Sequence, residues 1–298
     1  MSEAAIAHRV LERMRRQIRS KVVDLAAIRA GNEFAEALQH SVVPPTTLKT
    51  MHPAHAIYTY VQNQMSVIAE QLLALPEMKP FAKIIGEAQE EYMPSWPPMS
   101  PLSTSYFWCW SNFDATANAH RETLGSVTLK VAAEFGVHPK MLALMQTFNN
   151  STMSVYRIER QTDATVHLRD LVTNRPCSAI CESGYCAIAG ELWFTRLLPP
   201  ALIGETQYVV FTSPYVLMSP EAAWSQYLDR IAANDSSRSR IAALERNRKW
   251  GTSRRYWPEF VFEGYVNHQP GAIFLKGLPD VAESRTHSGE YVRHADGH

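Results

Sequence analysis

Apolar residues recur at helical spacing through the first half of the chain. Over residues 9 to 30 they stand three and four positions apart, which predicts an amphipathic helix with one buried face. The members of this apolar stripe are Leu11, Met14, Ile18, Val22 and Leu25. Gly31-Asn32 is expected to end or interrupt the helix, and Pro44-Pro45 predicts a non-helical connector.

Further helices are predicted between this connector and residue 150. Pro53 and Pro139 suit the first positions of helices, because the fixed φ and missing N–H of proline are harmless there. The expected ranges are 54–75, 79–91, a short helix from 103 onward, 121–135 and 139–148. A proline-rich aromatic segment with Trp96, Trp108 and Trp110 feeds the short helix, and we expect its large side chains to bury and to hold the helical layer to a β-rich module.

From about residue 152 the chain changes to short runs of β-branched and aromatic residues separated by polar turns. This texture is typical of a meander or a small barrel. The predicted strands are 153–160, 164–171, 177–182, 187–197 and 207–212. In the second of them Val166 and Leu168 alternate with His167 and Arg169, so the first pair is expected to face a core and the second pair to face water.

The last third of the chain begins with a helix-start signal at residues 219–221, followed by apolar residues at helical spacing. A break is expected at 234–237, then a second helical segment, and residues 256–266 suggest a last strand or an extended arm. The fold class is therefore α+β: an N-terminal helical layer, a small antiparallel sheet or barrel, and a C-terminal helical segment. The expected parts are 1–150, 151–217 and 218–298, and they can also form one continuous domain.

Composition indicates the size of the core and the cellular compartment. The 298 residues are 46% hydrophobic and 19% charged, which is enough apolar surface for a substantial core. Charged residues precede any apolar run at the start, and no apolar stretch approaches the roughly 18 residues that span a bilayer. The cysteines are few and clustered, which favours a reducing compartment. We therefore expect a cytoplasmic protein without membrane contact.

Signature motifs of common enzymes are missing from the sequence. It contains no phosphate-binding P-loop, no dinucleotide-binding glycine motif, no zinc-protease motif, no nucleophile elbow and no EF-hand loop. No cofactor is predicted. An active site assembled from scattered residues would leave no such trace, so the question of catalysis stays open.

Cys177, Cys181 and Cys186 form a C-x3-C-x4-C pattern, with His167 nearby in the chain. Structural zinc usually takes ligands in two close pairs, so this spacing favours small buried thiols over a metal site. We predict reduced cysteines and no structural metal. The catalytic alternative is Cys186 as a nucleophile, with His167 as its base and Asp170 as the orienting acid.

The uneven distribution of basic residues along the chain is the most unusual feature of the sequence. The formal net charge is zero, yet residues 8–21 hold six bases against Glu12 alone, and residues 238–255 hold seven against Glu245 alone. The candidate nucleic-acid-binding residues are Arg9, Arg13, Arg16, Arg246, Arg248, Lys249, Arg254 and Arg255. We predict that Arg9, Arg13 and Arg16 form a solvent ridge, and that both clusters make one positive surface for a polyanion. A solvated face, or a patch that docks on an acidic protein, is the competing interpretation.

Two functions remain open at this point. The leading hypothesis is a non-catalytic binding or assembly protein, whose partners include another protein, a second copy of the chain, or nucleic acid through the arginine-rich segments. The alternative is a hydrolase or nuclease that uses His167, Asp170 and Cys186. Convergence of His167, Arg169, Asp170 and Glu191 in one pocket would favour the enzyme, because a binding module has no reason to gather them.

Overall fold

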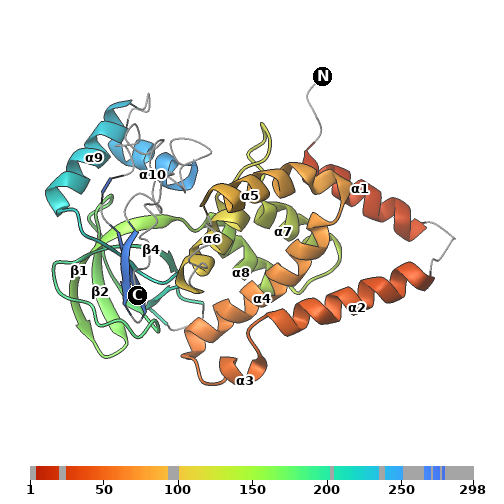
Figure 1. The fold of residues 1–298 in the computed structure, drawn as a ribbon, viewed down its shortest axis with the longest axis horizontal. Helices are drawn as coiled ribbons and strands as arrows, with labels where there is room; N and C mark the ends of the chain where they lie inside the picture. Colours follow the sequence, from red (N-terminus) through yellow and green to blue (C-terminus); the bar gives the residue numbers. More distant parts are fainter. Residues whose placement is uncertain are drawn as a thin grey trace, which may run out of the picture.

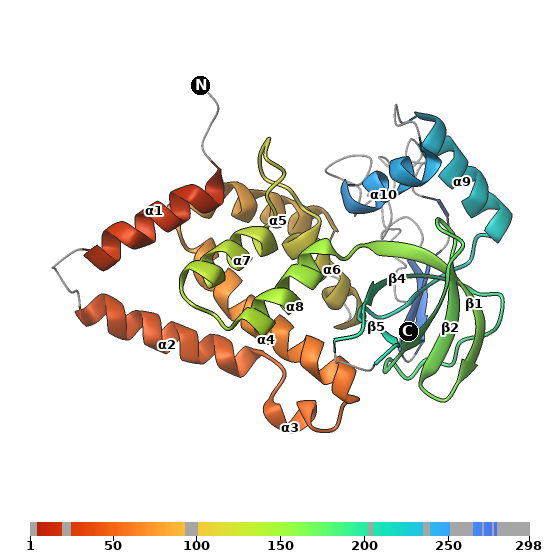
Figure 2. The same ribbon diagram turned by 180° about the vertical axis from the view of Figure 1, so that it is seen from behind.

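A layer of helices lies beside a β module, and the two pack along one continuous interface (Figures 1 and 2). The computed structural model describes residues 5–19, 25–92, 101–201, 205–234, 239–250, 265–269, 271–275 and 277–278. The α+β class predicted from the sequence is confirmed, with the helices first and the β module after them.

The helical layer contains the elements of the first half of the chain. They are α1 (Ile6–Arg19), α2 (Leu25–Ser41), α3 (Pro45–Leu48), α4 (Pro53–Leu73), the 3-10 turn η1 (Pro76–Met78), α5 (Lys79–Tyr92), α6 (Pro101–Phe113), α7 (Leu124–Glu134) and α8 (Pro139–Asn150). Both α4 and α8 have proline in their first turn and a histidine N-cap whose ring nitrogen accepts a backbone N–H. In α7, Thr123 and Ser126 form a reciprocal capping box.

The prediction of one helix over residues 9–30 is wrong. The structure has two separate helices, α1 and α2, and Gly31-Asn32 lies inside α2 instead of ending a helix. α1 packs against the core through the buried Ile6 and Val10 and the partly buried Leu11 and Met14, whereas Ile18 near its end is 67% exposed. The apolar spacing was helical, but tertiary contacts decide which part of the stripe is buried. At the connector, Pro45 begins the short helix α3, in the first-turn position that proline tolerates.

The β module is built from strands that form one mixed sheet. They are β1 (Met153–Thr162), β2 (Thr165–Asp170), β3 (Pro176–Ile180), β4 (Leu192–Leu198), β5 (Tyr208–Val210), β6 (Tyr215–Leu217), β7 (Tyr265–Gln269) and β8 (Ala272–Leu275). Their order is β1-β2-β3-β5-β4-β6-β8-β7, and pairing of β1 with β4 closes the first part into a barrel. The helices α9 (Glu221–Asn234) and α10 (Arg240–Trp250) cover one side (Figure 2).

The sheet differs in three respects from the sequence-based expectation. It is not purely antiparallel, because β3 pairs in parallel with β5 and β6 with β8. The predicted strand 187–197 begins only at Leu192, since the residues before it form a loop. The strands β6 and β8 were not predicted, and their pairing carries the sheet beyond residue 217. Three- and four-residue strands carry too little periodicity to stand out in the sequence.

Side-chain alternation in β2 is confirmed. Val166 and Leu168 are fully buried inside the barrel, while His167 and Arg169 on the other face are half-exposed. Outside the barrel, the face of β4, β6 and β8 packs against α6 and α9, with Trp110 and Trp224 in that interface.

Of the aromatic residues in α6, Tyr106, Trp110 and Phe113 are buried as expected, while Trp108 is half-buried. Trp96 lies outside the described residues. Of the helices in the described part of the chain, none has the length and apolar character needed to cross a membrane.

Candidate functional site

A cleft of about 490 Å³ opens at one end of the barrel, where the barrel meets α8 and α10. Mouths of barrels and junctions between layers are frequent ligand sites, and this volume lies within the range of small-molecule pockets. The helical side contributes Thr147, Asn150, Ser151 and Thr152. The barrel contributes Tyr156, Asp170, Thr173, Arg175, Pro176, Cys177, Leu197, Pro199 and Tyr208, and α10 contributes Arg248. Hydroxyl, amide and guanidinium groups therefore stand among apolar residues in the lining.

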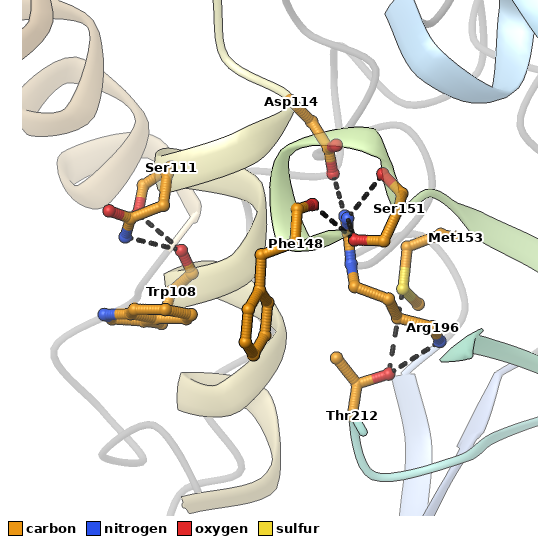
Figure 3. A network of polar contacts seen from close by, with 9 residues as sticks. Trp108, Ser111, Asp114, Phe148, Ser151, Met153, Arg196 and Thr212 are labelled. Atoms are coloured by element: carbon orange, nitrogen blue, oxygen red, sulfur yellow. Dashed lines mark hydrogen bonds and ion pairs between the residues drawn. The ribbon is translucent and has the colours of Figure 1, made fainter. Parts of the chain in front are cut away.

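The wall behind the cleft is held by Arg196 of β4, whose side chain is completely buried (Figure 3). Its guanidinium donates to the carbonyl oxygen of Ser151 at 2.9 Å and to the Ser151 hydroxyl at 2.8 Å, and forms an ion pair with Asp114. Ser151 itself lines the cleft. A buried cation is tolerated only with such partners, so this network fixes the junction between α6, α8 and the barrel.

Thr212 continues the network on the sheet side (Figure 3). Its hydroxyl accepts the backbone N–H of Arg196 at 3.0 Å, and its carbonyl accepts the hydroxyl of Thr195 at 3.0 Å. These bonds lock the backbone of β4 next to the buried guanidinium. The position of Ser151 at the cleft wall is therefore set by several bonds at once.

Charged groups of the cleft favour an anion. Arg248 forms an ion pair with Asp170, with 3.1 Å between Nη2 and Oδ2. The other carboxylate oxygen of Asp170 accepts the backbone N–H groups of Val172 and Thr173 at 2.7 and 3.1 Å. Arg175 lies exposed in the turn between β2 and β3. The described lining residues thus include two guanidinium groups and one carboxylate, and that carboxylate is already satisfied.

Arg248 retains an unused donor. Its Nε atom is buried and makes no hydrogen bond within the part of the chain that the structure describes. A buried guanidinium N–H without a partner is costly. Arg248 and the exposed Arg175 therefore form the cationic side of the site.

Burial keeps the other titratable groups of the cleft protonated. It raises the pKa of the Cys177 thiol to about 12, with the charges of Asp170 and Glu159 acting in the same direction. Burial likewise raises the pKa of the Tyr156 hydroxyl. Neither group is a thiolate or phenolate nucleophile near neutral pH, so both can serve only as uncharged polar lining. Tyr208 at the rim is 37% exposed and offers a flat aromatic ring.

The residues predicted for catalysis do not come together. His167 and Asp170 lie on opposite faces of β2, because three positions separate them and side chains alternate along a strand. His167 contacts the Ser178 hydroxyl at 2.9 Å on the outer face, and no carboxylate of the described chain contacts its ring. Cys186 is exposed in the loop between β3 and β4. The carboxylate of Asp170 already accepts a backbone N–H of the β2–β3 turn and pairs with Arg248.

The wider set named for the enzyme hypothesis is also dispersed. Of His167, Arg169, Asp170 and Glu191, only Asp170 lines the cleft. Arg169 forms an ion pair with Glu159 on the strand surface. Glu191 accepts from the Tyr185 hydroxyl at 2.8 Å and the Trp193 indole at 3.2 Å, so it supports the β3–β4 loop.

All four cysteines are free thiols. Cys109 and Cys181 are buried, Cys177 is half-buried and Cys186 is exposed. In the described part of the chain, no three His, Cys, Asp or Glu side chains are arranged to hold a metal ion. His287, His294 and His298, in the tail, lie outside that part.

The first arginine cluster is largely used to attach α1. Arg13 forms an ion pair with Glu77 at 3.4 Å and is half-buried. Arg9 is also half-buried, and Arg16 lies near Glu12 on its own helix at 3.9 Å. The predicted solvent ridge is therefore reduced mainly to Arg16, because Arg9 and Arg13 border the buried face that begins at Ile6.

The second cluster lies elsewhere in the fold. Figures 1 and 2 show α10 beside the β module, whereas α1 lies at the far side of the helical layer. The described residues of the second cluster therefore do not lie beside α1. Arg246 is exposed on α10, while Arg248 turns into the cleft. Lys249 belongs to α10, but its side chain is not among those described, and Arg254 and Arg255 lie outside the described residues.

Comparisons with protein families, with curated proteins and with solved structures find no match for this chain. The site is therefore defined by its own geometry. Sequence reasoning missed Arg175 and Tyr208, which line the cleft, and the buried Arg196 behind it; each of them is isolated in the chain. Of the lining residues, Asp170 and Arg248 were among those named from the sequence, and a lone arginine in a strand-strand turn was the local signal for Arg175.

Proposed function

We propose that this chain is a non-catalytic binding protein whose barrel-end cleft takes a phosphate-bearing ligand, with single-stranded nucleic acid as the leading class. The observation that carries the proposal is that Arg175 and Arg248 both line a cleft whose only described carboxylate, that of Asp170, is already satisfied. Guanidinium groups match phosphate oxygens in geometry as well as in charge.

The remaining lining supports the same ligand class. Hydroxyl and amide groups of Thr147, Asn150 and Thr152 line the same cleft and suit phosphate and sugar oxygens. The exposed ring of Tyr208 provides a surface on which an unpaired base can stack. A cationic groove combined with an aromatic platform is typical of proteins that bind single strands.

The barrel topology gives an independent argument of lower weight. The order β1-β2-β3-β5-β4, closed by β1–β4 with β3 parallel to β5, is that of an OB-type Greek-key barrel. Barrels of this type bind oligonucleotides and oligosaccharides through strands 2 and 3 and the loop between strands 4 and 5. In this chain the cleft takes Asp170 and Cys177 from those two strands, and Pro199 and Tyr208 from the ends of that loop. Fold alone does not define function, so the arginines remain the main argument.

The test is a salt titration of binding to a labelled single-stranded oligonucleotide of about 12 nucleotides, starting at about 50 mM salt. Arg175→Ala is the informative variant, because Arg175 is exposed and its loss should leave the fold intact. A charged hydrogen bond contributes about 1.5–3 kcal/mol, so we expect an affinity loss of at least about tenfold. The slope of log K against log salt should also fall by somewhat under one unit.

Arg240→Ala is the matched control, since it removes the same charge from α10 at a position that pairs with Asp229 away from the cleft. Its affinity should stay close to wild type. Duplex DNA and a mononucleotide serve as competitors: competition by the mononucleotide at equal strength would identify a small phosphate ligand in place of a strand. Absence of binding to any of them, or equal slopes for wild type and Arg175→Ala, would contradict the proposal.

A further inference from the structure

Helix α1 lies at the outer edge of the helical layer, on the side away from the β module (Figures 1 and 2). It buries Ile6, Ala7 and Val10, whereas its last five residues, 15–19, are all exposed. The hydrophobic cluster that receives these three side chains comes from helices, because its buried members all lie between residues 6 and 131. α1 thus belongs to a different cluster from the residues that pack on the barrel.

The surface that α1 covers is apolar. Leu11 and Met14 of α1 pack on it while only partly buried. Residues 6, 10 and 14 of α1 recur every four positions, the spacing with which amphipathic helices dock in grooves. We call this surface the α1-binding surface, and its buried residues are Ala69, Leu72, Met78, Phe81, Leu124, Val127 and Val131.

A carboxylate from a distant part of the chain holds the N-terminal end of α1, which has no acidic residue in its own first turn. Glu122 is 5% exposed and accepts the backbone N–H groups of Ile6 at 2.6 Å and Ala7 at 3.3 Å. Asn118 and Lys130 donate to the same carboxylate at 2.8 and 3.3 Å. Burial alone would raise the pKa of this group, but the hydrogen bonds, first that of Asn118, outweigh burial and lower the pKa. The charged carboxylate therefore satisfies N–H groups that a helix leaves unpaired and complements the helix dipole.

Two further carboxylates border the α1-binding surface. Arg13 pairs with Glu77 of η1 at 3.4 Å, and Arg15 pairs with Glu134 of α7 at 2.7 Å. Positions two apart on a helix point roughly 200° apart, so the two arginines lie on opposite flanks of the apolar stripe. α1 carries five arginines against Glu12 alone. The surface therefore matches a basic amphipathic helix in apolar pattern and in charge.

We propose that α1 is a detachable helix, and that the surface beneath it is a binding site for a basic amphipathic helix, which α1 occupies in cis. The separate cluster and the clamp by Glu122 carry the proposal, because α1 can open as a unit while the barrel and its own cluster stay folded. The occupant in trans is a second copy of the α1 sequence, since this sequence supplies the partners of all three carboxylates. The proposal does not depend on the ligand proposed for the cleft.

Hydrogen–deuterium exchange of the full chain, read by mass spectrometry, tests detachment. Amides in α1 should exchange at least about tenfold faster than those of α4 and α7. Glu122→Gln should accelerate exchange in α1 by about tenfold or more, because it removes charged hydrogen bonds, and should leave the barrel strands unchanged. Glu87→Gln is the matched control, since that carboxylate pairs with Lys83 on the exposed face of α5. It should leave exchange in α1 unchanged.

A labelled peptide of residues 5–19 tests the binding site by fluorescence anisotropy, at concentrations up to about 1 mM. The full chain with Val10→Asp should stay folded and bind the peptide, because the substitution places a charge at a position that is 0% exposed and so expels the cis helix. Wild type should bind the peptide at least about tenfold more weakly, since its own tethered α1 competes at a high effective concentration.

Adding Glu122→Gln to Val10→Asp should weaken peptide binding by about tenfold or more. Equal protection of α1 and α7 in the exchange experiment would overturn the proposal. Global unfolding of Val10→Asp would also overturn it, because a detachable helix is not needed by the rest of the fold. Peptide binding that is absent, or that is unchanged by Glu122→Gln, would overturn it as well.

Discussion

Arg196 and Asp114 form an ion pair that joins strand β4 to the end of helix α6, and the arginine side chain is 0% exposed. Asp114 itself is 15% exposed. The pair stands directly behind the cleft, because Arg196 also donates to Ser151 in the cleft wall. It therefore couples the stability of the interface between the helical layer and the barrel to the shape of the candidate site.

Removal of the carboxylate should destabilise the protein strongly. Asp114→Ala leaves a buried guanidinium without its counter-ion, and loss of one partner of such a pair costs about 3–5 kcal/mol of unfolding free energy. Urea unfolding checks this value. Asp229→Ala is the control: that carboxylate pairs with Arg240 on the surface, at 66% exposure, and should change stability by no more than about 1 kcal/mol. Equal effects of the two variants would show that the Arg196 pair is not truly desolvated.

Two glycines in helices should respond in opposite directions to alanine. A Cβ at Gly125 in α7 would stand 2.8 Å from the Phe113 ring and from the Asn149 amide oxygen, so Gly125→Ala forces repacking and should cost about 1–3 kcal/mol. A Cβ at Gly86 in α5 meets no atom within 4 Å. Gly86→Ala should therefore stabilise the protein by about 0.5–1 kcal/mol. Thermal melting of both variants checks this prediction. If the helices of this layer were loosely packed, both changes would raise the melting temperature.

His55 should make stability depend on pH below neutrality. Its ring stacks on Phe211 with 6.1 Å between centroids, and Nδ1 lies 3.5 Å from Glu182. Burial lowers the pKa of His55 below its ordinary value of 6.5; Glu182 opposes this shift and the nearby His52 adds to it. The unfolded chain then binds more protons than the native state, so unfolding free energy should fall as pH drops from about 6.5 toward the native pKa.

The measurement is the urea midpoint between about pH 7.5 and pH 5.5, in wild type and in His55→Asn. In the variant the urea midpoint should depend less on pH in this interval, whatever its value at about pH 7.5. His8→Asn is the control, because that side chain is 59% exposed. A decrease of the midpoint with acid that is the same in wild type and in His55→Asn would refute the assignment to His55.

Local sequence information was sufficient for most individual elements. Proline positions predicted the starts of α4 and α8. The alternation of apolar and polar residues in β2 predicted that Val166 is buried and that His167 lies on the outer face. These features depend on neighbours within one turn or one strand, so they can be recognised without tertiary contacts. Two predictions failed because the sequence shows only such local patterns. The apolar stripe of α1 continues past the part of the helix that is buried, and β6 is too short to show an alternating pattern.

By itself, then, the sequence determined the α+β class, the order of helices before strands, and an excess of arginine near α10, because composition and periodicity are local properties. Only the tertiary structure decided that the barrel closes through β1 and β4, that Arg196 is buried, and that His167 and Asp170 point apart. It also decided that Arg248 and Arg175, 73 positions apart in the chain, line the same cleft. Such contacts depend on strand register and on pairing between distant segments, and no short stretch of sequence specifies either of them.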